Sequence, residues 1–176
     1  MPVRACLKYA EGADEVDALR REATLYGREL AALAGVAVPR TYGLYVGGTE
    51  AVPIACLVME LCVGAEVRRS ADELGRLAIL ALCKVHAVGV MHNTPLDLRH
   101  FVMKGKKVFL VDFALAVVHR CENAHPVLWD KNFSPVVAAP HDLAECTELV
   151  EAERNIFSQV GENLPMKISP SFVRLQ

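Results

Sequence analysis

The chain has 176 residues, a hydrophobic fraction of 53% and a formal net charge of −2. This length suits one domain with a single core, and the hydrophobic fraction excludes a chain that is disordered throughout. The near-neutral charge offers no basic field for nucleic acid, so we expect no nucleic-acid partner.

Apolar segments and cysteines bear on where the chain resides. The longest apolar stretch, residues 52–63, is too short to span a bilayer and contains Glu60. The N-terminal segment has no hydrophobic signal core, and we therefore expect no membrane association. The cysteines are scattered without paired spacing, as is typical of reduced proteins, and a cytoplasmic location is predicted. They are Cys6, Cys56, Cys62, Cys83, Cys121 and Cys146.

One short segment gathers side chains that can bind metals. His119, Cys121 and His125 lie within seven residues of one another. Their spacing matches no strong zinc pattern. A metal site is one interpretation, and the interpretation that we favour is a surface loop.

The first third of the chain predicts a β-α-β-β unit. Residues 3–9 alternate between apolar and polar and predict a strand. A turn at 11–14 precedes a helix over 16–33, where apolar residues recur at helical spacing, and Gly35 is expected to end that helix. Two strands then follow at 41–45 and 54–60, around a turn at Gly47 and Gly48.

The middle of the chain predicts a long helix and a hairpin. Ser70 is a favourable N-cap for a helix over 71–88, and Gly89 is expected to end it. Two short extended segments, 101–103 and 107–111, flank the polar turn Lys104-Gly105-Lys106, which is typical of a β-hairpin.

The last third is less regular. Residues 124–140 contain three prolines and predict a loop. An amphipathic pattern over 141–160 predicts a second long helix. The tail, 161–176, carries two more prolines and is expected to form a loosely packed arm.

Three segments carry residues that suggest a nucleotide site. Lys8 lies in the strand VRACLKYA, Glu22 lies inside the helix segment LRREATLY, and Asp112 ends the apolar run VFLVDFA. A lysine held by a carboxylate can neutralise phosphate charge, and a strand-end carboxylate can bind magnesium. Taken singly, Lys8 is an exposed lysine, Glu22 an ordinary helix residue, and Asp112 a helix-capping aspartate.

The order of elements gives these segments a common meaning. The predicted elements follow one another in a definite order: a strand with a lysine, a helix with a glutamate, two strands, a long helix, a histidine-containing loop and a hairpin that ends in Asp-Phe. This order resembles the protein-kinase-like superfamily over about residues 3–118, with Ala114 in place of the glycine of the Asp-Phe-Gly motif. The resemblance is closest to small atypical kinases of the RIO type and to divergent kinase-like proteins of fungi.

The resemblance implies an α+β, two-lobed fold of minimal size. A reduced small lobe would cover residues 1–63, and a reduced, mostly helical large lobe would cover 64–176, with 161–176 as its arm. Only seven residues precede Lys8, so we expect the first two strands of the small lobe and their glycine-rich loop to be missing. That loop normally covers the nucleotide phosphates.

Site residues follow from the resemblance, with ATP and magnesium as the implied cofactors. Lys8, Glu22 and Asp112 would bind the nucleotide and its metal ion. In LVMELCVG, residues 57–64, Met59 would line the adenine site, and Glu60 and Cys62 would offer it backbone groups. A buried strand end is the alternative interpretation of that segment.

The loop between the long helix and the hairpin resembles a catalytic loop. In the stretch 84–103, His92 matches the family's histidine, Thr94 falls at the catalytic aspartate, and His100 falls at the metal-binding asparagine. Asp97 is the carboxylate that remains for the role of base; alternatively, it stabilises a turn beside Pro95. The resemblance thus names Asp97, Lys8 and His92 as catalytic candidates, and Asp112 and His100 as metal ligands.

These departures from the family pattern shape the expected function. We expect a degenerate kinase-like protein that binds ATP and magnesium, transfers phosphate weakly or not at all, and serves as a binding or scaffold module. One alternative is an active minimal phosphotransferase acting on a protein or small-molecule hydroxyl. Another is an interlobe cleft reused by a different enzyme for a small ligand. The exposed edge strand that carries Lys8 suggests pairing with a protein partner or a second copy.

Overall fold

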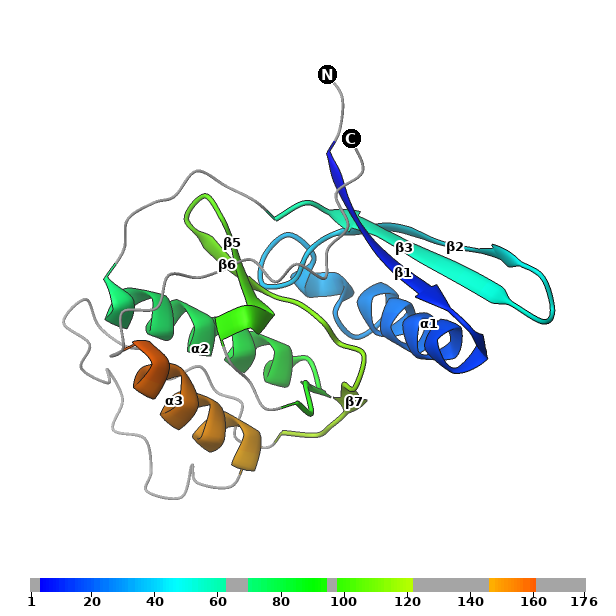
Figure 1. The fold of residues 1–176 in the computed structure, drawn as a ribbon. Coiled ribbons are helices and arrows are strands. Elements are labelled where there is room, and N and C mark those ends of the chain that lie inside the picture. The colour runs from blue at the N-terminus through cyan, green and yellow to red at the C-terminus, as the bar shows by residue number, and fades with distance from the viewer. Residues whose placement is uncertain (1–3, 63–69, 95–97, 122–145, 161–176) are drawn as a thin grey trace.

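The computed structural model of the chain describes residues 4–62, 70–94, 98–121 and 146–160. Their fold is a mixture of helices and small antiparallel sheets, so the α+β class predicted from the sequence is confirmed. Figure 1 shows one group of elements built on a three-stranded sheet and a second group built on two helices and a hairpin. Within these ranges, no helix combines the length and the apolar character that crossing a membrane requires.

The first group is the predicted β-α-β-β unit. It comprises β1 (Ala5–Glu11), α1 (Ala13–Gly27), β2 (Thr41–Gly48) and β3 (Pro53–Glu60). The strand order is β1-β3-β2, with both pairings antiparallel, so β3 is central and β1 lies at an edge of the sheet as described. Helix α1 runs beside this sheet (Figure 1) and turns its buried side chains towards the core.

The helix prediction for this unit was wrong at both of its ends. The helix begins at Ala13, directly after Gly12, and it ends at Gly27 rather than near Gly35. The chain then forms a short 3-10 helix, η1 (Ala31–Leu33). Apolar residues continue at helical spacing through both helices, so periodicity alone does not reveal the break. Gly35, at φ +74°, instead forms a turn in which its N–H donates to the Val38 carbonyl.

The turn between β2 and β3 also lies later than predicted. Strand β2 continues through Gly48, and the reversal follows at 49–52. There the Thr49 N–H donates to the Val52 carbonyl, and the Val52 N–H donates to the Thr49 hydroxyl. The two glycines that suggested a turn therefore end the strand.

The second group matches its prediction closely. Helix α2 (Ala71–Ala87) starts after Ser70, whose hydroxyl accepts a hydrogen bond from the Glu73 N–H at 3.2 Å. Gly89, at φ +84°, follows its end. The predicted hairpin forms from β5 (Phe101–Lys104) and β6 (Lys107–Leu110), and the 3-10 turn η2 (Leu98–His100) leads into it.

Two short strands were not expected from the sequence. Strand β4 (Val90–Met91) pairs with β7 (Val117–Val118) in an antiparallel ladder. Two residues are too few to produce a recognisable alternation. This ladder brings the segment after Asp112 back to the end of α2.

Helix α3 completes the second group and packs against α2 (Figure 1). It spans Thr147–Val160, so it begins after Cys146 and covers the later part of the helix predicted over 141–160. Residues 141–145, the whole predicted loop at 124–140 and the predicted arm at 161–176 are outside the described residues. The proposed lobe boundary near residue 63 is outside them as well.

Backbone and side-chain hydrogen bonds join the two groups. The Leu110 N–H donates to the Ala37 carbonyl at 2.8 Å, and the Lys107 ammonium donates to the Gly35 carbonyl at 2.8 Å. The hairpin is thus fixed against the segment that connects α1 to β2. The residues just after β6 consequently lie close to α1 and β1.

The Tyr26 hydroxyl yields a test of the core. The Tyr26 ring stacks edge-to-face on Phe113 with centroids 5.3 Å apart, yet its buried hydroxyl has no hydrogen-bond partner within the described part of the chain. Tyr26→Phe should therefore raise the unfolding free energy by about 1 kcal/mol, measured by urea denaturation. Tyr45→Phe, at a residue that is 64% exposed, should change it by less than about 0.5 kcal/mol. A loss of stability in Tyr26→Phe would contradict the unpaired hydroxyl.

Candidate functional site

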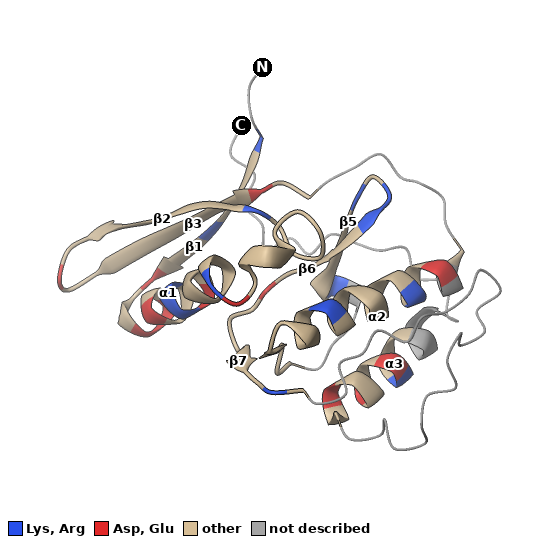
Figure 2. Cartoon of the chain, turned by 180° about the vertical axis from the view of Figure 1, so that it is seen from behind, with Lys and Arg blue, Asp and Glu red and all other residues tan. Residues whose placement is uncertain are grey.

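Three charged side chains predicted from separate segments meet at one point. The Lys8 ammonium lies 2.7 Å from Glu22 Oε2 and 2.5 Å from Asp112 Oδ1. Lys8 comes from β1, Glu22 from α1, and Asp112 from the segment that follows β6. We call these three residues the ion cluster. Figure 2 shows the charged residues along α1 and on the neighbouring segments.

Glu22 is the buried member of the ion cluster. Its side chain is 1% exposed, and Oε1 accepts a hydrogen bond from the Phe113 N–H at 3.1 Å. Burial raises the pKa of the Glu22 carboxyl above its ordinary value, although the Lys8 ammonium and the Phe113 amide oppose this change. The Glu22 carboxyl thus accepts hydrogen bonds from β1, through Lys8, and from the segment after β6, through Phe113.

Lys8 and Asp112 hold each other in their charged forms. Burial alone lowers the pKa of Lys8, but the two carboxylates outweigh it, and the net pKa is raised. Burial likewise opposes the ionisation of Asp112, but the bond from Lys8 outweighs it and the pKa is lowered. The Asp112 side chain is 49% exposed, so its carboxylate is accessible from solvent.

The backbone at the Asp-Phe pair sends its two side chains in opposite directions. Asp112 has φ +69°, in the left-handed region that aspartate tolerates better than most residues. The next residue, Phe113, is fully buried and stacks edge-to-face on Tyr26 and on His92. A polar ligand group is therefore exposed by the same turn that anchors an aromatic ring in the core.

His92 is buried beneath this turn. Its Nε2–H donates to the Val111 carbonyl at 3.0 Å, because a carbonyl can only accept, and Nδ1 accepts from the Thr94 hydroxyl at 2.5 Å. Burial lowers the pKa of His92, which favours this neutral form. Both ring nitrogens are thus engaged within the protein, so His92 positions the loop and the end of the strand. The sequence predicts a catalytic role for His92, and such a role would require contact with the reacting atoms.

The other loop residues are placed as follows. The His100 ring lies 5.2 Å from the His92 ring and is near enough to Asp112 to help lower its pKa. The His100 carbonyl also accepts from the Val111 N–H at 2.9 Å. Thr94 holds His92, as above, and Asp97, the predicted base, lies outside the described residues.

At the end of β3, the predicted adenine-binding residues have structural partners. Met59 is 2% exposed and belongs to the core. The Glu60 N–H donates to the Arg40 carbonyl at 2.7 Å, so this backbone donor is used within the protein. Cys62 is half-buried, and burial raises the pKa of its thiol to about 12.

The Glu60 side chain has a role that the sequence did not reveal. Its carboxylate accepts from the Lys104 ammonium at 2.6 Å and from the Arg40 N–H at 3.2 Å, which links the sheet to the β5–β6 hairpin. Burial by itself raises the pKa of Glu60, but these bonds outweigh it, and the pKa is lowered from its ordinary value of 4.5. Ionised Glu60 therefore stabilises the fold.

This link predicts a pH dependence of stability. The contribution of Glu60 is fully present above pH 4.5, the value expected for the unfolded chain, and is lost as the pH falls through the lower pKa of the folded state. Glu60→Gln should lower the unfolding free energy by about 1 kcal/mol at pH 7, since Lys104 is partly exposed. In denaturation curves measured from pH 7 to 3, the difference from wild type should shrink below pH 4.5. A difference that stays constant would contradict the ion-pair assignment. Glu50→Gln, on an exposed turn, is the control.

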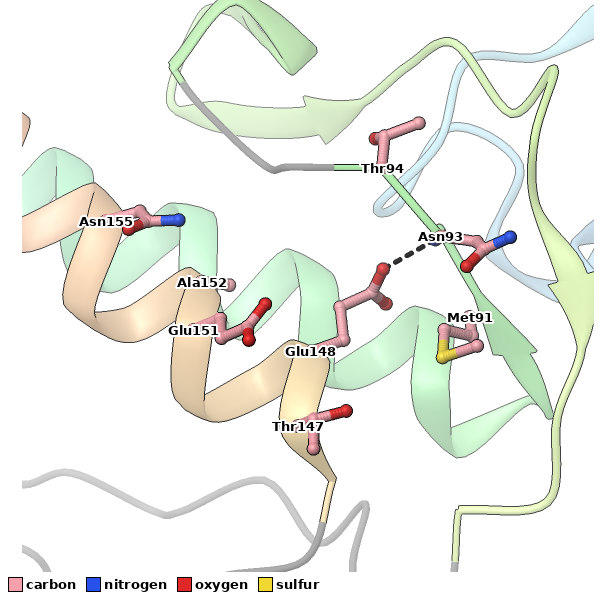
Figure 3. A pocket seen from close by; sticks show the side chains of 8 residues that line it. All are labelled: Met91, Asn93, Thr94, Thr147, Glu148, Glu151, Ala152 and Asn155. Atoms are coloured by element: carbon pink, nitrogen blue, oxygen red, sulfur yellow. Dashed lines mark hydrogen bonds between the residues drawn. The ribbon is translucent and has the colours of Figure 1, made fainter.

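A cavity of about 300 Å³ lies between α3 and the loop after β4. Figure 3 shows its lining, which includes Thr94, Glu148, Glu151 and Asn155. None of the residues of the ion cluster lines it. It is therefore a separate feature from the nucleotide site expected from the sequence.

Glu148 is the buried carboxylate beside this cavity, and sequence reasoning missed it. Its Oε1 accepts from the Asn93 N–H at 2.6 Å (Figure 3), and its Oε2 accepts from the His92 N–H at 2.9 Å and from His86 Nε2 at 2.6 Å. Burial raises the pKa of Glu148, but these donors outweigh it and the pKa is lowered. Helix α3 thereby holds the loop that carries Thr94. No local motif marks such a residue, because its partners are more than fifty positions away.

Comparison with known proteins adds no assignment. Neither a scan against protein-family models nor a search of curated proteins finds a match to this chain. The function must therefore be inferred from the geometry of the residues themselves.

The ion cluster predicts a large effect of one isosteric substitution. Glu22→Gln keeps the side-chain volume but removes the buried charge that faces Lys8, so it should lower the unfolding free energy by about 1.5–3 kcal/mol. Chemical denaturation at pH 7 measures the change. Glu15→Gln, on the exposed side of α1, should cost less than about 0.5 kcal/mol. Equal stabilities of the two variants would show that the cluster is not formed in solution.

Proposed function

We propose that this chain is a kinase-like protein that binds a nucleoside triphosphate together with Mg²⁺, and that its phosphoryl transfer is weak or absent. The ion cluster is the observation that carries this proposal. In kinases, a lysine held by a helix glutamate and an aspartate bound to Mg²⁺ must both be in place. Lys8, Glu22 and Asp112 supply that chemistry from the corresponding types of element.

The exposure of each side chain in the ion cluster suggests its role. Glu22 is buried and keeps the Lys8 ammonium at the inner end of the site. Asp112 is half exposed, and its carboxylate is the hard oxygen ligand that Mg²⁺ prefers. Glu22 thus serves as the anchor, Lys8 neutralises phosphate, and Asp112 takes the metal ion, with His100 beside it.

Nucleotide and metal ion should enter together. Lys8 and Asp112 neutralise each other at 2.5 Å. Mg²⁺ alone would lie beside the ammonium of Lys8, and phosphate alone would lie beside the carboxylate of Asp112; each arrangement places like charges together. The magnesium–nucleotide complex replaces the lost ion pair with two attractive contacts. Binding of the nucleotide should therefore depend strongly on Mg²⁺.

Weak transfer is proposed from the loop. Thr94 occupies the position that the resemblance gives to the catalytic base, and its hydroxyl is donated to His92. A hydroxyl is a poor base at neutral pH, and His92 has no free ring nitrogen. In the alternative of an active phosphotransferase, Asp97 would take the proton from the accepting hydroxyl.

A thermal-shift titration tests the proposal. ATP with Mg²⁺ should raise the Tm of the wild type by mass action once its concentration exceeds Kd, and ATP without Mg²⁺ should raise it much less. Lys8→Ala and Asp112→Asn should abolish most of the shift. Asparagine suits this position because it tolerates positive φ. Lys106→Ala and Asp17→Asn, at exposed sites, are the matched controls.

The outcomes separate the possibilities. A wild type without a magnesium-dependent shift contradicts the proposal. A shift that survives in both Lys8→Ala and Asp112→Asn means that nucleotide binds elsewhere. Steady ADP release that is lost in Asp97→Asn would establish the active phosphotransferase in place of the weak one.

A further inference from the structure

Four side chains that can bind metals converge at a second point in the molecule. His86, His119, Cys121 and Cys146 each offer one ligand atom, and these atoms all lie within 4.8 Å of one another. We call these residues the His-Cys cluster. His86 comes from the last turn of α2, His119 and Cys121 follow β7, and Cys146 directly precedes α3.

The distances within this cluster approach those of a tetrahedral zinc site. Zn–N and Zn–S bonds of ordinary length place neighbouring ligand atoms about 3.3–3.8 Å apart. Cys146 Sγ already lies 3.5 Å from His86 Nδ1 and 3.9 Å from His119 Nε2. The four ligand atoms all lie within 4.8 Å of one another, at most about 1 Å beyond the spacing of a tetrahedral site.

A buried carboxylate orients the first ligand. His86 Nε2 lies 2.6 Å from Glu148 Oε2, and both side chains are buried. An ionised carboxylate can only accept, so Nε2 carries a proton, and Nδ1, which faces Cys146, is the nitrogen left to bind an ion. A histidine whose second nitrogen is bonded to a carboxylate is the usual arrangement at protein zinc sites.

The backbone at two of the other ligands, His119 and Cys146, is also fixed. The His119 N–H donates to the Gly89 carbonyl at 2.8 Å, next to the β4–β7 ladder. The Cys146 carbonyl accepts from Val150 in the first turn of α3, and the Cys146 side chain is buried. His119 and Cys146 are therefore held in place by hydrogen-bonded backbone.

We propose that His86, His119, Cys121 and Cys146 bind one Zn²⁺ in a closed, four-coordinate structural site. Two imidazoles and two thiolates suit zinc better than magnesium or calcium, which prefer oxygen. Binding displaces one proton from each of the two thiols. The ion joins α2, the segment after β7 and α3. Through Glu148 it also stabilises the loop that begins at His92.

Metal content of the full chain is the first test. Protein purified with a phosphine reductant and supplied with zinc should retain about one zinc per chain after gel filtration, measured by mass spectrometry of the element. Cys146→Ser and His119→Ala should retain less than roughly a tenth of that amount. Cys56→Ser, which removes a cysteine of the three-stranded sheet, is the matched control and should keep the full amount.

Cobalt reports the ligand set without any substitution, so the test survives if the ligand variants fail to fold. Wild-type protein loaded with Co²⁺ should show the intense visible bands of tetrahedral cobalt and a thiolate charge-transfer band in the near ultraviolet. Octahedral cobalt spectra, or the absence of charge transfer, would overturn the proposal.

The carboxylate supplies a third measurement. Glu148→Gln should keep the zinc stoichiometry but weaken the affinity by about 10–100-fold in competition with a chromophoric chelator. An unchanged affinity would show that Glu148 does not orient His86 towards a metal ion.

Two results would exclude the site outright. One is a wild type that binds no zinc under reducing, zinc-replete conditions. The other is a Cys121–Cys146 disulfide that persists in the presence of the reductant and is found by peptide mass mapping. These readouts involve no nucleotide, so they are independent of the proposed nucleotide binding.

Discussion

The buried carboxylate of Glu22 is the constraint on which much of the structure depends. A charge at 1% exposure is tolerable only if donors surround it, and here the donors are the Lys8 ammonium and the Phe113 N–H. Those two donors belong to β1 and to the segment after β6. Satisfying one carboxylate therefore fixes both elements against α1, and it sets the turn at which Asp112 faces solvent.

A second carboxylate performs a comparable task on the other side of the loop. Glu148, from α3, accepts the backbone N–H groups of His92 and Asn93. The His92 ring then reaches the Val111 carbonyl, next to Asp112. A continuous path of hydrogen bonds thus runs from α3 through the loop to the strand end. Under the two proposals, a zinc ion would hold one end of that path and a magnesium–nucleotide complex would bind at the other.

Local signals predicted the elements well where one signal decides the structure. Ser70 and Gly89 correctly marked the two ends of α2, because an N-cap and a glycine at positive φ each act on the helix end within a few residues. The predicted helix over 16–33 failed because apolar periodicity continues across the break after Gly27. The β4–β7 ladder was missed because two residues carry no pattern.

The site residues also differ in whether the sequence could predict them. The resemblance singled out Lys8, Glu22 and Asp112, and the structure brings these three together. The partners of Glu60 and Glu148 were missed because they depend on tertiary contacts alone. His119 and Cys121 were noticed, but His86 and Cys146, distant in sequence, could not be joined to them; His125 is outside the described residues.

The long sequence separations within the ion cluster have a consequence for synthesis on the ribosome. Lys8 is 104 residues from Asp112, and Glu22 is 91 residues from Phe113. The N-terminal β-α-β-β unit is thus translated long before Phe113, whose N–H is the second donor to the buried Glu22 carboxylate. Until residue 113 leaves the exit tunnel, Lys8 can pair with Glu22 Oε2 inside the unit, but Oε1 must be hydrated, so the unit cannot bury this carboxylate fully. Folding of the β-α-β-β unit is therefore completed only after Phe113 has been synthesised.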